Sequence, residues 1–382
     1  MTPKLNLLFY LLSFSILILS CDSDDDNGQG PPGDDGDLTM IDFQPKEMDI
    51  TIPEGYPLLE QPEDNKMTID GVLLGRHLFF DPILSADETM SCGSCHLQEG
   101  SFTDNLPVSE GIDGIAGNRS SMPLINLAYN FKGLFWDGRV NSLEEQALLP
   151  VEDPIELHNN WDDLVEKLKA HDSYPEKFRK AFGITNKSQI TKELAVKAIA
   201  QFERTLVTSG NSEFDKVFHQ NIGFFSDEAN NGFAIFFDTS PDLPDGECSH
   251  CHSEPFFTDD DFRNNGLDFA ETLDDFKDNG RGDVTGNPFD NGKFRTPTLW
   301  NWEFSAPYMH DGRFETIEEV LDHYISGGQW SPNKDPLIIP HDDPSVPEFY
   351  INDEHRADLL AFLKTLRDTT LLNNERYSNP FN

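Results

Sequence analysis

The stretches CGSCH at residues 92–96 and CSHCH at residues 248–252 repeat one C-x-x-C-H spacing, and they decide the fold class. This spacing attaches a c-type haem: both thiols add to the haem vinyl groups, and the adjacent histidine binds the iron. A redox cysteine pair or half of a zinc site also uses C-x-x-C, but neither requires histidine at the same place twice. The sequence therefore predicts two covalent haem c groups, haem one and haem two. The attachment residues are Cys92, Cys95, Cys248 and Cys251, and the iron ligands are His96 and His252.

The fifth cysteine, Cys21, follows a stretch that has the features of an export signal. Lys4 precedes an apolar run over residues 5–19, and the junction before Cys21 resembles a bacterial lipobox. The sequence predicts a lipoprotein signal peptide with a lipidated cysteine at residues 1–21. An ordinary signal peptide with a chance cysteine is the alternative. Residues 22–44 are rich in Asp, Gly and Pro, and they predict a disordered acidic tether. We expect an exported protein, lipid-anchored at the outer membrane and facing either the periplasm or the surface.

Composition narrows the possible partners. The net charge of −41 excludes nucleic acid, whose phosphates need Lys and Arg. A basic electron donor would suit this surface, although acidic residues also simply keep a protein soluble. After the signal, no apolar run approaches the roughly 20 residues that span a bilayer. Membrane contact is expected through the lipid anchor only.

The pattern along the chain predicts a mainly α fold: two cytochrome c-like haem domains with long loops. Apolar positions at helical spacing predict helices at residues 191–207 and 356–367, and apolar runs precede both haem motifs, at residues 71–80 and 227–237. An aromatic-Asp-Gly-Arg element occurs at residues 136–139 and again at 310–313, which indicates a duplicated module. A turn-rich gap after residue 208 places the boundary between an N-terminal domain, 45–210, and a C-terminal domain, 211–382.

Several blocks resemble a known family. LGRHLFFD at residues 74–81 followed by SCGSCH at 91–96, and FRTPTL at 294–299 followed by APYMHDG at 306–312, are similar to the haem regions of bacterial di-haem cytochrome c peroxidases. The resemblance implies two packed haem domains, reduction of hydrogen peroxide at the N-terminal haem, and electron entry through the C-terminal one.

The resemblance also implies a catalytic set. In this family a Trp-Asp-Gly-Arg element is followed by a glutamine and then a glutamate at ten-residue steps, which here are Trp136, Gln146 and Glu156. The carboxylate would act as general base and then acid towards peroxide. The amide would orient peroxide by hydrogen bonding. The indole would relay electrons between the haems. On the sequence alone, Glu156 could equally be a surface glutamate, Gln146 an exposed helix residue, and Trp136 a core aromatic.

Two positions depart from the typical peroxidase. Residues 97–157 contain no histidine, and the loop that usually supplies a sixth ligand to haem one reads SEGIDG at 109–114. Haem one is therefore expected to be open to peroxide without prior reduction. In addition, the residue fourteen after His310 is Tyr324, where peroxidases carry methionine. The MauG-type branch of the family has the same substitution, which favours oxidised states of haem two.

The ligand of haem two has rivals. Met309 is the only methionine after the second motif, His323 is a neighbouring candidate, and Tyr324 also continues an apolar helix face as a core residue would. A structural calcium between the domains is usual in the family. Its matching positions are Ser120, where the family has asparagine, and the carbonyls of Ser305 and Pro307.

Three functions follow from this pattern. The first is an exported peroxidase that takes electrons from a small cytochrome or another extracytoplasmic donor. The second is a MauG-like oxidase that modifies a partner protein or a small molecule. The third, a non-enzymatic electron carrier, would need two six-coordinate haems and no distal acid. The Glu156 match and the histidine-free loop count against it.

Overall fold

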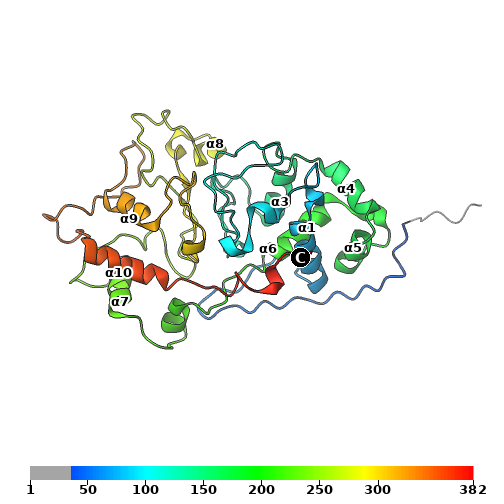
Figure 1. Cartoon of the computed structure of the whole chain (residues 1–382), viewed down its shortest axis with the longest axis horizontal. Helices are drawn as coiled ribbons and strands as arrows, with labels where there is room; N and C mark the ends of the chain where they lie inside the picture. Colours follow the sequence, from blue (N-terminus) through cyan, green and yellow to red (C-terminus); the bar gives the residue numbers. More distant parts are fainter. Residues whose placement is uncertain (1–35, 382) are drawn as a thin grey trace, which may run out of the picture. The chain divides into compact units, whose positions relative to one another are not determined.

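A computed structural model describes residues 36–381, and this part of the chain is mainly helical with long loops, as predicted (Figure 1). The only paired strands among these residues, β1 (Phe262–Arg263) and β2 (Phe294–Arg295), form a short antiparallel ladder. The helices are α1 Ile69–Phe80, α2 Cys92–Cys95, α3 Leu143–Glu152, α4 Trp161–Ala170, α5 Tyr174–Phe182, α6 Lys192–Glu203, α7 Asp227–Phe236, α8 Arg281–Thr285, α9 Ile317–Ile325 and α10 Asp353–Lys364.

The start of the chain is only partly covered. The predicted signal peptide and lipidated cysteine, residues 1–21, lie outside the described residues, as does most of the predicted tether. Leu38, inside the predicted tether segment 22–44, is buried, and its N–H donates to the carbonyl of Thr185 at 2.9 Å. Contacts with the folded part thus begin before the predicted boundary at residue 45.

Two helix pairs repeat one packing arrangement. Helix α1 packs on α6, and α7 packs on α10 (Figure 1). A Cβ at Gly75 of α1 would lie 1.9 Å from the Ala198 carbonyl oxygen, and one at Gly232 of α7 would lie 2.0 Å from that of Asp358. Both crossings are therefore so close that only glycine fits. Each glycine helix precedes a haem motif, which supports duplication of one module.

The two aromatic-Asp-Gly-Arg elements also share one conformation. Each lies in a loop closed by an antiparallel bridge, at residues 134–140 and 308–314. Gly138 and Gly312 have φ values of +70° and +62°, a region that disfavours side chains. In each loop the aspartate accepts a hydrogen bond from the backbone N–H of the arginine. A helix follows each of these loops, α3 after the first and α9 after the second.

The chain returns to its N-terminal half at its end. The Arg76 guanidinium on α1 donates to the carbonyls of Ser378 and Glu375, each at 2.7 Å, and the Gln98 amide donates to that of Leu371 at 2.6 Å. The last residues therefore pack beside the first haem motif, although they belong to the predicted C-terminal domain.

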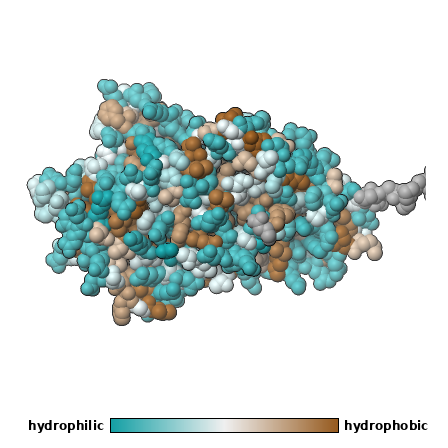
Figure 2. Space-filling model, in the orientation of Figure 1, coloured by the Kyte–Doolittle hydropathy of each residue, from teal (hydrophilic) through white to brown (hydrophobic). Residues whose placement is uncertain are grey.

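The surface agrees with the acidic composition. Hydrophilic residues cover most of the face shown in Figure 2. Among residues 36–381, no helix is both long enough and apolar enough to cross a bilayer.

Candidate functional site

The first C-x-x-C-H motif forms the single turn α2 and ends at His96, whose backbone N–H donates to the Cys92 carbonyl at 3.0 Å. The Nδ1 of His96 donates to the Phe102 carbonyl at 2.8 Å. Burial lowers the pKa of His96, so its imidazole is neutral. A neutral ring whose Nδ1 is held by a backbone carbonyl leaves Nε2 for a metal, the usual arrangement of an iron-binding histidine.

The second motif repeats this geometry. The backbone N–H of His252 donates to the Cys248 carbonyl at 3.0 Å, and its Nδ1 donates to the Phe257 carbonyl at 3.0 Å. Burial lowers the pKa of His252 as well. None of the four motif cysteines forms a disulfide. Both motifs thus offer two thiols and one oriented imidazole.

A cavity of about 780 Å³ lies beside the first motif. This volume is within the range of about 300–1,000 Å³ that is typical of ligand and cofactor pockets. The structure brings these predicted site residues together on its wall: Cys92, Cys95, His96, Ser120, Trp136, Gln146 and Glu156.

Glu156 lies shortly after helix α3, in a segment whose backbone is fixed. Its N–H donates to the Asp153 carbonyl, and its carbonyl accepts from the N–H of Ile112, both at 3.0 Å. Burial, and secondly the charge of Asp153, raise the pKa of Glu156 to about 7, while Arg139 opposes them. A carboxyl that is half ionised near neutral pH can both take and return a proton.

Gln146 lies on α3, which Ser142 caps by accepting from the Glu145 N–H. The side chain is half-buried and lines the cavity, although sequence reasoning alone favours exposure on this helix. Its amide can therefore offer hydrogen bonds to a molecule in the cavity.

The histidine-free loop lies against the Glu156 segment. Ser109, Glu110 and Gly111 line the cavity. A Cβ at Gly111 would lie 2.3 Å from the Ile155 carbonyl oxygen, so the two segments touch at the backbone. Among the described residues, the histidines on the cavity wall are His96 and His310. The His310 ring is stacked on Phe294, with centroids 3.5 Å apart.

Trp136 connects segments from both halves of the chain. It is buried, its Nε1–H donates to the Ser120 carbonyl at 2.9 Å, and its carbonyl accepts from the Arg295 N–H at 2.8 Å. Its ring lies edge-on to His310, with centroids 6.5 Å apart. Both predicted roles, core aromatic and electron relay, are compatible with this position.

The three candidate ligands of haem two, Tyr324, Met309 and His323, all contact Asn265. The Asn265 side-chain amide donates to the Tyr324 hydroxyl at 3.3 Å and to the Met309 sulfur at 3.5 Å. The Asn265 carbonyl accepts from His323 Nε2 at 3.0 Å. Burial raises the pKa of Tyr324 to about 12, and the neighbouring Cys251 and Cys248 contribute. Oxygen and sulfur donors thus lie side by side near the second motif, and the assignment to Tyr324 stays a prediction.

The predicted calcium positions lie in two neighbouring contacts. The Ser120 hydroxyl donates to the Met309 carbonyl at 3.0 Å. The Asn105 amide donates to the carbonyls of Phe304 and Ala306, at 2.7 and 2.8 Å, in the segment that contains Ser305 and Pro307. The calcium site stays a prediction.

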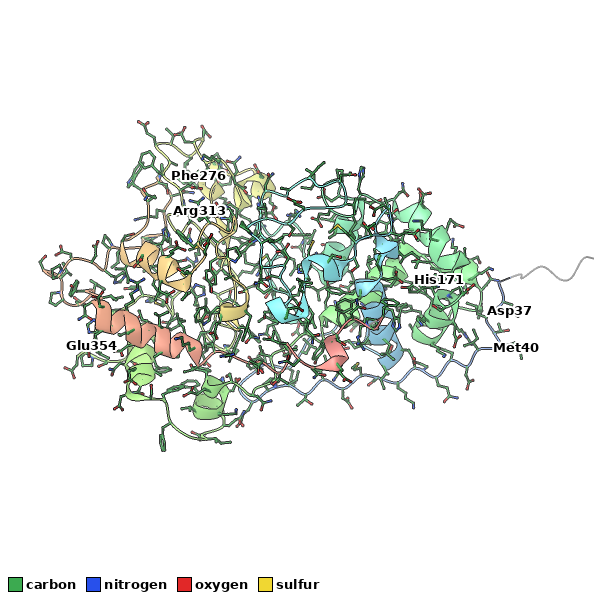
Figure 3. All side chains as sticks on the ribbon, in the orientation of Figure 1. Asp37, Met40, His171, Phe276, Arg313 and Glu354 are labelled. Carbon is green, nitrogen blue, oxygen red and sulfur yellow. The ribbon has the colours of Figure 1, made fainter. Side chains whose placement is uncertain are left out.

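Basic side chains on the cavity wall were not predicted from the sequence. Arg295 is 3% exposed, is paired with Asp260, and has Nε and Nη2 groups without a hydrogen-bond partner. Burial lowers its pKa to about 10. Arg119, Arg139 and Arg313 also reach this wall, and Arg313 is labelled in Figure 3. Buried guanidinium groups with free N–H donors fit the carboxylates of haem propionates. Arg295 belongs to the FRTPTL block at residues 294–299, whose resemblance to the family could have identified it.

Comparisons with known proteins agree with this geometry. The family model described as "Di-haem cytochrome c peroxidase" matches residues 70–222. The chain is 36% identical over 320 residues to the methylamine utilization protein MauG of Methylorubrum extorquens, covering 82% of both chains. It is 32% identical over 337 residues to the cytochrome-c peroxidase IdrP1 of a Pseudomonas species, covering 81% of this chain and 84% of that protein. The chain belongs to the di-haem cytochrome c peroxidase family.

Among solved structures, one titled as a MauG-like protein associated with microbial copper homeostasis matches with a TM-score of 0.78 and 31% identity. The match covers 88% of this chain and 100% of that one. Membership of the family and its MauG-like branch confirms the predicted fold class, two haem c cofactors and an oxidoreductase that acts on peroxide.

Proposed function

We propose that this chain is an exported enzyme that reduces hydrogen peroxide at haem one with electrons that enter through haem two. The observation that carries the proposal is that Gln146 and Glu156 share one cavity with the first haem motif. An electron carrier has no need of such a cavity or of a carboxyl group with a pKa of about 7 in its wall.

The proposed reaction consumes one peroxide, two electrons and two protons and releases two waters, and each site residue has a separate role in it. When bound, the haem iron supplies the site for peroxide and exchanges electrons. Glu156 takes a proton from one peroxide oxygen and returns it to the other. The Gln146 amide orients peroxide without exchanging a proton. Trp136 relays electrons between the haems, and Arg295 holds a propionate.

A MauG-like oxidase is the second candidate. It is supported by the 36% identity to a MauG protein and by Tyr324 beside Asn265, in place of the methionine expected there. In this case a partner protein or a small molecule would supply the two electrons. Tyr324 would hold haem two as an anionic ligand, which would stabilise its oxidised states.

The test is an EPR spectrum of the ferric protein as isolated, followed by peroxide addition. No histidine of loop 109–114 can block haem one, so we expect a high-spin signal and a reaction without prior reduction. A purely low-spin spectrum, with activity only after half-reduction, would contradict this proposal. Turnover with a reduced small cytochrome distinguishes a peroxidase from an oxidase, which would consume peroxide only with its own substrate.

Location, domains and calcium complete the proposal. Cys21 carries lipid at the outer membrane, and a Cys21→Ala variant should leave the membrane fraction while keeping both haems. Residues 45–210 hold haem one and residues 211–382 hold haem two. Calcium binds between them at Ser120 and at the carbonyls of Ser305 and Pro307, as the family resemblance implies.

A further inference from the structure

A second carboxyl group, Glu203, lies on the wall of the haem one cavity. It is the last residue of α6 and is 4% exposed. Its side chain lines the cavity together with Ile199, which lies one turn earlier on the same helix face. Its Oε2 atom is buried and has no hydrogen-bond partner. Glu203 belongs to none of the sequence motifs, and neither proposed activity uses it.

The surroundings of Glu203 disfavour its charged form. Burial and the charge of Glu144 on α3 raise its pKa to about 8, and Arg204 opposes them. Arg204, however, donates from Nη2 to both carboxylate oxygens of Glu144 at 2.8 Å, so the carboxylate of Glu144 already compensates the charge of Arg204. Glu203 also sits at the C-terminal end of a helix, where the helix dipole is unfavourable to an anion. The other titratable groups on the cavity wall include Glu156, Glu110, Arg139 and His96.

Burial, and secondly the charge of Glu203, raise the pKa of the Cys92 thiol, so Glu203 lies within electrostatic reach of the haem anchor. We propose that Glu203 is the proton acceptor coupled to reduction of haem one. The step balances as ferric haem one plus the Glu203 carboxylate plus one electron plus one proton, giving ferrous haem one plus the Glu203 carboxylic acid.

The physical cause is charge compensation. An added electron removes one positive charge from the cavity, and a neighbouring carboxylate then becomes more costly at low dielectric. The proton is drawn from solvent. Glu144, the acidic neighbour whose charge acts on Glu203, has a side chain that is 18% exposed. The proton bound by Glu203 is thus held in the same cavity in which peroxide reduction consumes two protons. The inference rests on haem attachment and not on peroxide turnover.

The experiment is a spectroelectrochemical titration of haem one in the full holoprotein between pH 6 and 10. The pKa of Glu203 is raised to about 8, so its carboxylate is available to accept a proton mainly above this pH. We expect the midpoint potential of the parent to change little near pH 6 and to fall with rising pH above about 8, with a slope approaching about 59 mV per tenfold change in proton concentration. Glu203→Gln should abolish the slope, and Glu203→Asp should restore it. Glu193→Gln, which alters an exposed carboxyl group in the first turn of the same helix, should leave the slope unchanged.

A second variant tests whether the charges of Glu144 and Arg204 set the pKa of Glu203. Glu144→Gln leaves the charge of Arg204 unpaired, so it lowers the pKa of Glu203. The pH range over which the midpoint potential of haem one changes should therefore move to lower pH. A flat parent titration, or an equal slope in Glu203→Gln, would overturn the proposal. If Glu203→Gln does not incorporate haem, an unmoved pH range in Glu144→Gln would overturn it. Loss of peroxide activity alone leaves these potentials measurable and the proposal standing.

Discussion

Glu156 should set the pH dependence of the reaction with peroxide. A general base must be ionised, and the pKa of this carboxyl group is raised to about 7, mainly by burial and secondly by Asp153. About one-eleventh of the groups are then ionised at pH 6 and about ten-elevenths at pH 8, so the rate constant should rise roughly tenfold over this range. The rate thus falls as acid protonates the group, with its midpoint near neutral pH.

Two substitutions move this profile in known directions. Glu156→Gln keeps the shape of the side chain but cannot accept a proton, and it should slow the reaction by roughly 10²–10⁴ and flatten the profile. Asp153→Asn removes the like charge and keeps an oxygen for the Ile155 N–H, which Asp153 binds at 3.0 Å. The pKa of Glu156 should fall, and the midpoint of the profile should move to lower pH.

The assay is stopped-flow absorbance under excess peroxide, with the second-order rate constant measured between pH 5 and 9. Glu152→Gln, at the exposed end of α3, is the matched control and should behave as the parent. Haem content and the ferric spectrum show whether each variant is intact. A Glu156→Gln rate within about threefold of the parent, or a flat parent profile from pH 6 to 8, would refute the assignment.

Three further outcomes are expected. Trp136→Phe keeps an aromatic ring but loses the hydrogen bond to the Ser120 carbonyl. Electron transfer between the haems should therefore slow, while the first reaction with peroxide keeps its rate. Equal slowing of both steps would exclude a relay role. Tyr324→Phe should change the spectrum of haem two alone, whereas a far-red thioether band in the oxidised parent would assign Met309 instead. Elemental analysis should find one calcium per chain, and Ser120→Asn, which restores the family's ligand, should tighten its binding; no calcium in either protein would remove the site.

Much of the helical framework was predictable from local sequence, because apolar spacing and capping residues act over a few positions. The helix predicted at 191–207 is α6, and Thr191 caps its start. It ends earlier than predicted, at Glu203, where the Thr205 N–H turns back to the Phe202 carbonyl. The helix predicted at 356–367 begins earlier, because Asn352 caps α10 through the His355 N–H.

Long-range contacts were not predictable in the same way. Arg76 and Ser378 are 302 positions apart, and only the folded chain shows that the C-terminal residues return to α1. The burial of Leu38 against Thr185 is a similar case, since its local composition resembles a tether. Neither contact has a periodic signature.

The same distinction between local and long-range features applies to the residues of the site. A haem motif is local, so its cysteines and histidine were readable directly. The set Trp136, Gln146 and Glu156 came from family resemblance, and the structure places all three in one cavity. Glu203 could not be recognised among 69 acidic residues, because its character comes from burial at a helix end beside an arginine that is already paired.

The two carboxyl groups of this cavity should therefore be separable by experiment. Glu156 is half-buried in a loop, and the charges of Asp153 and Arg139 act on its pKa in opposite directions, so it can lose and regain a proton during a reaction. Glu203 is deeply buried without a partner, so its ionisation follows the charge of its surroundings. The same residue type then performs two tasks because the environments differ. Glu156→Gln should alter the kinetic pH profile and leave the potential slope of haem one, and Glu203→Gln should do the reverse. If either substitution abolishes both pH dependences, the two groups titrate as one system, and separate roles cannot be assigned to them.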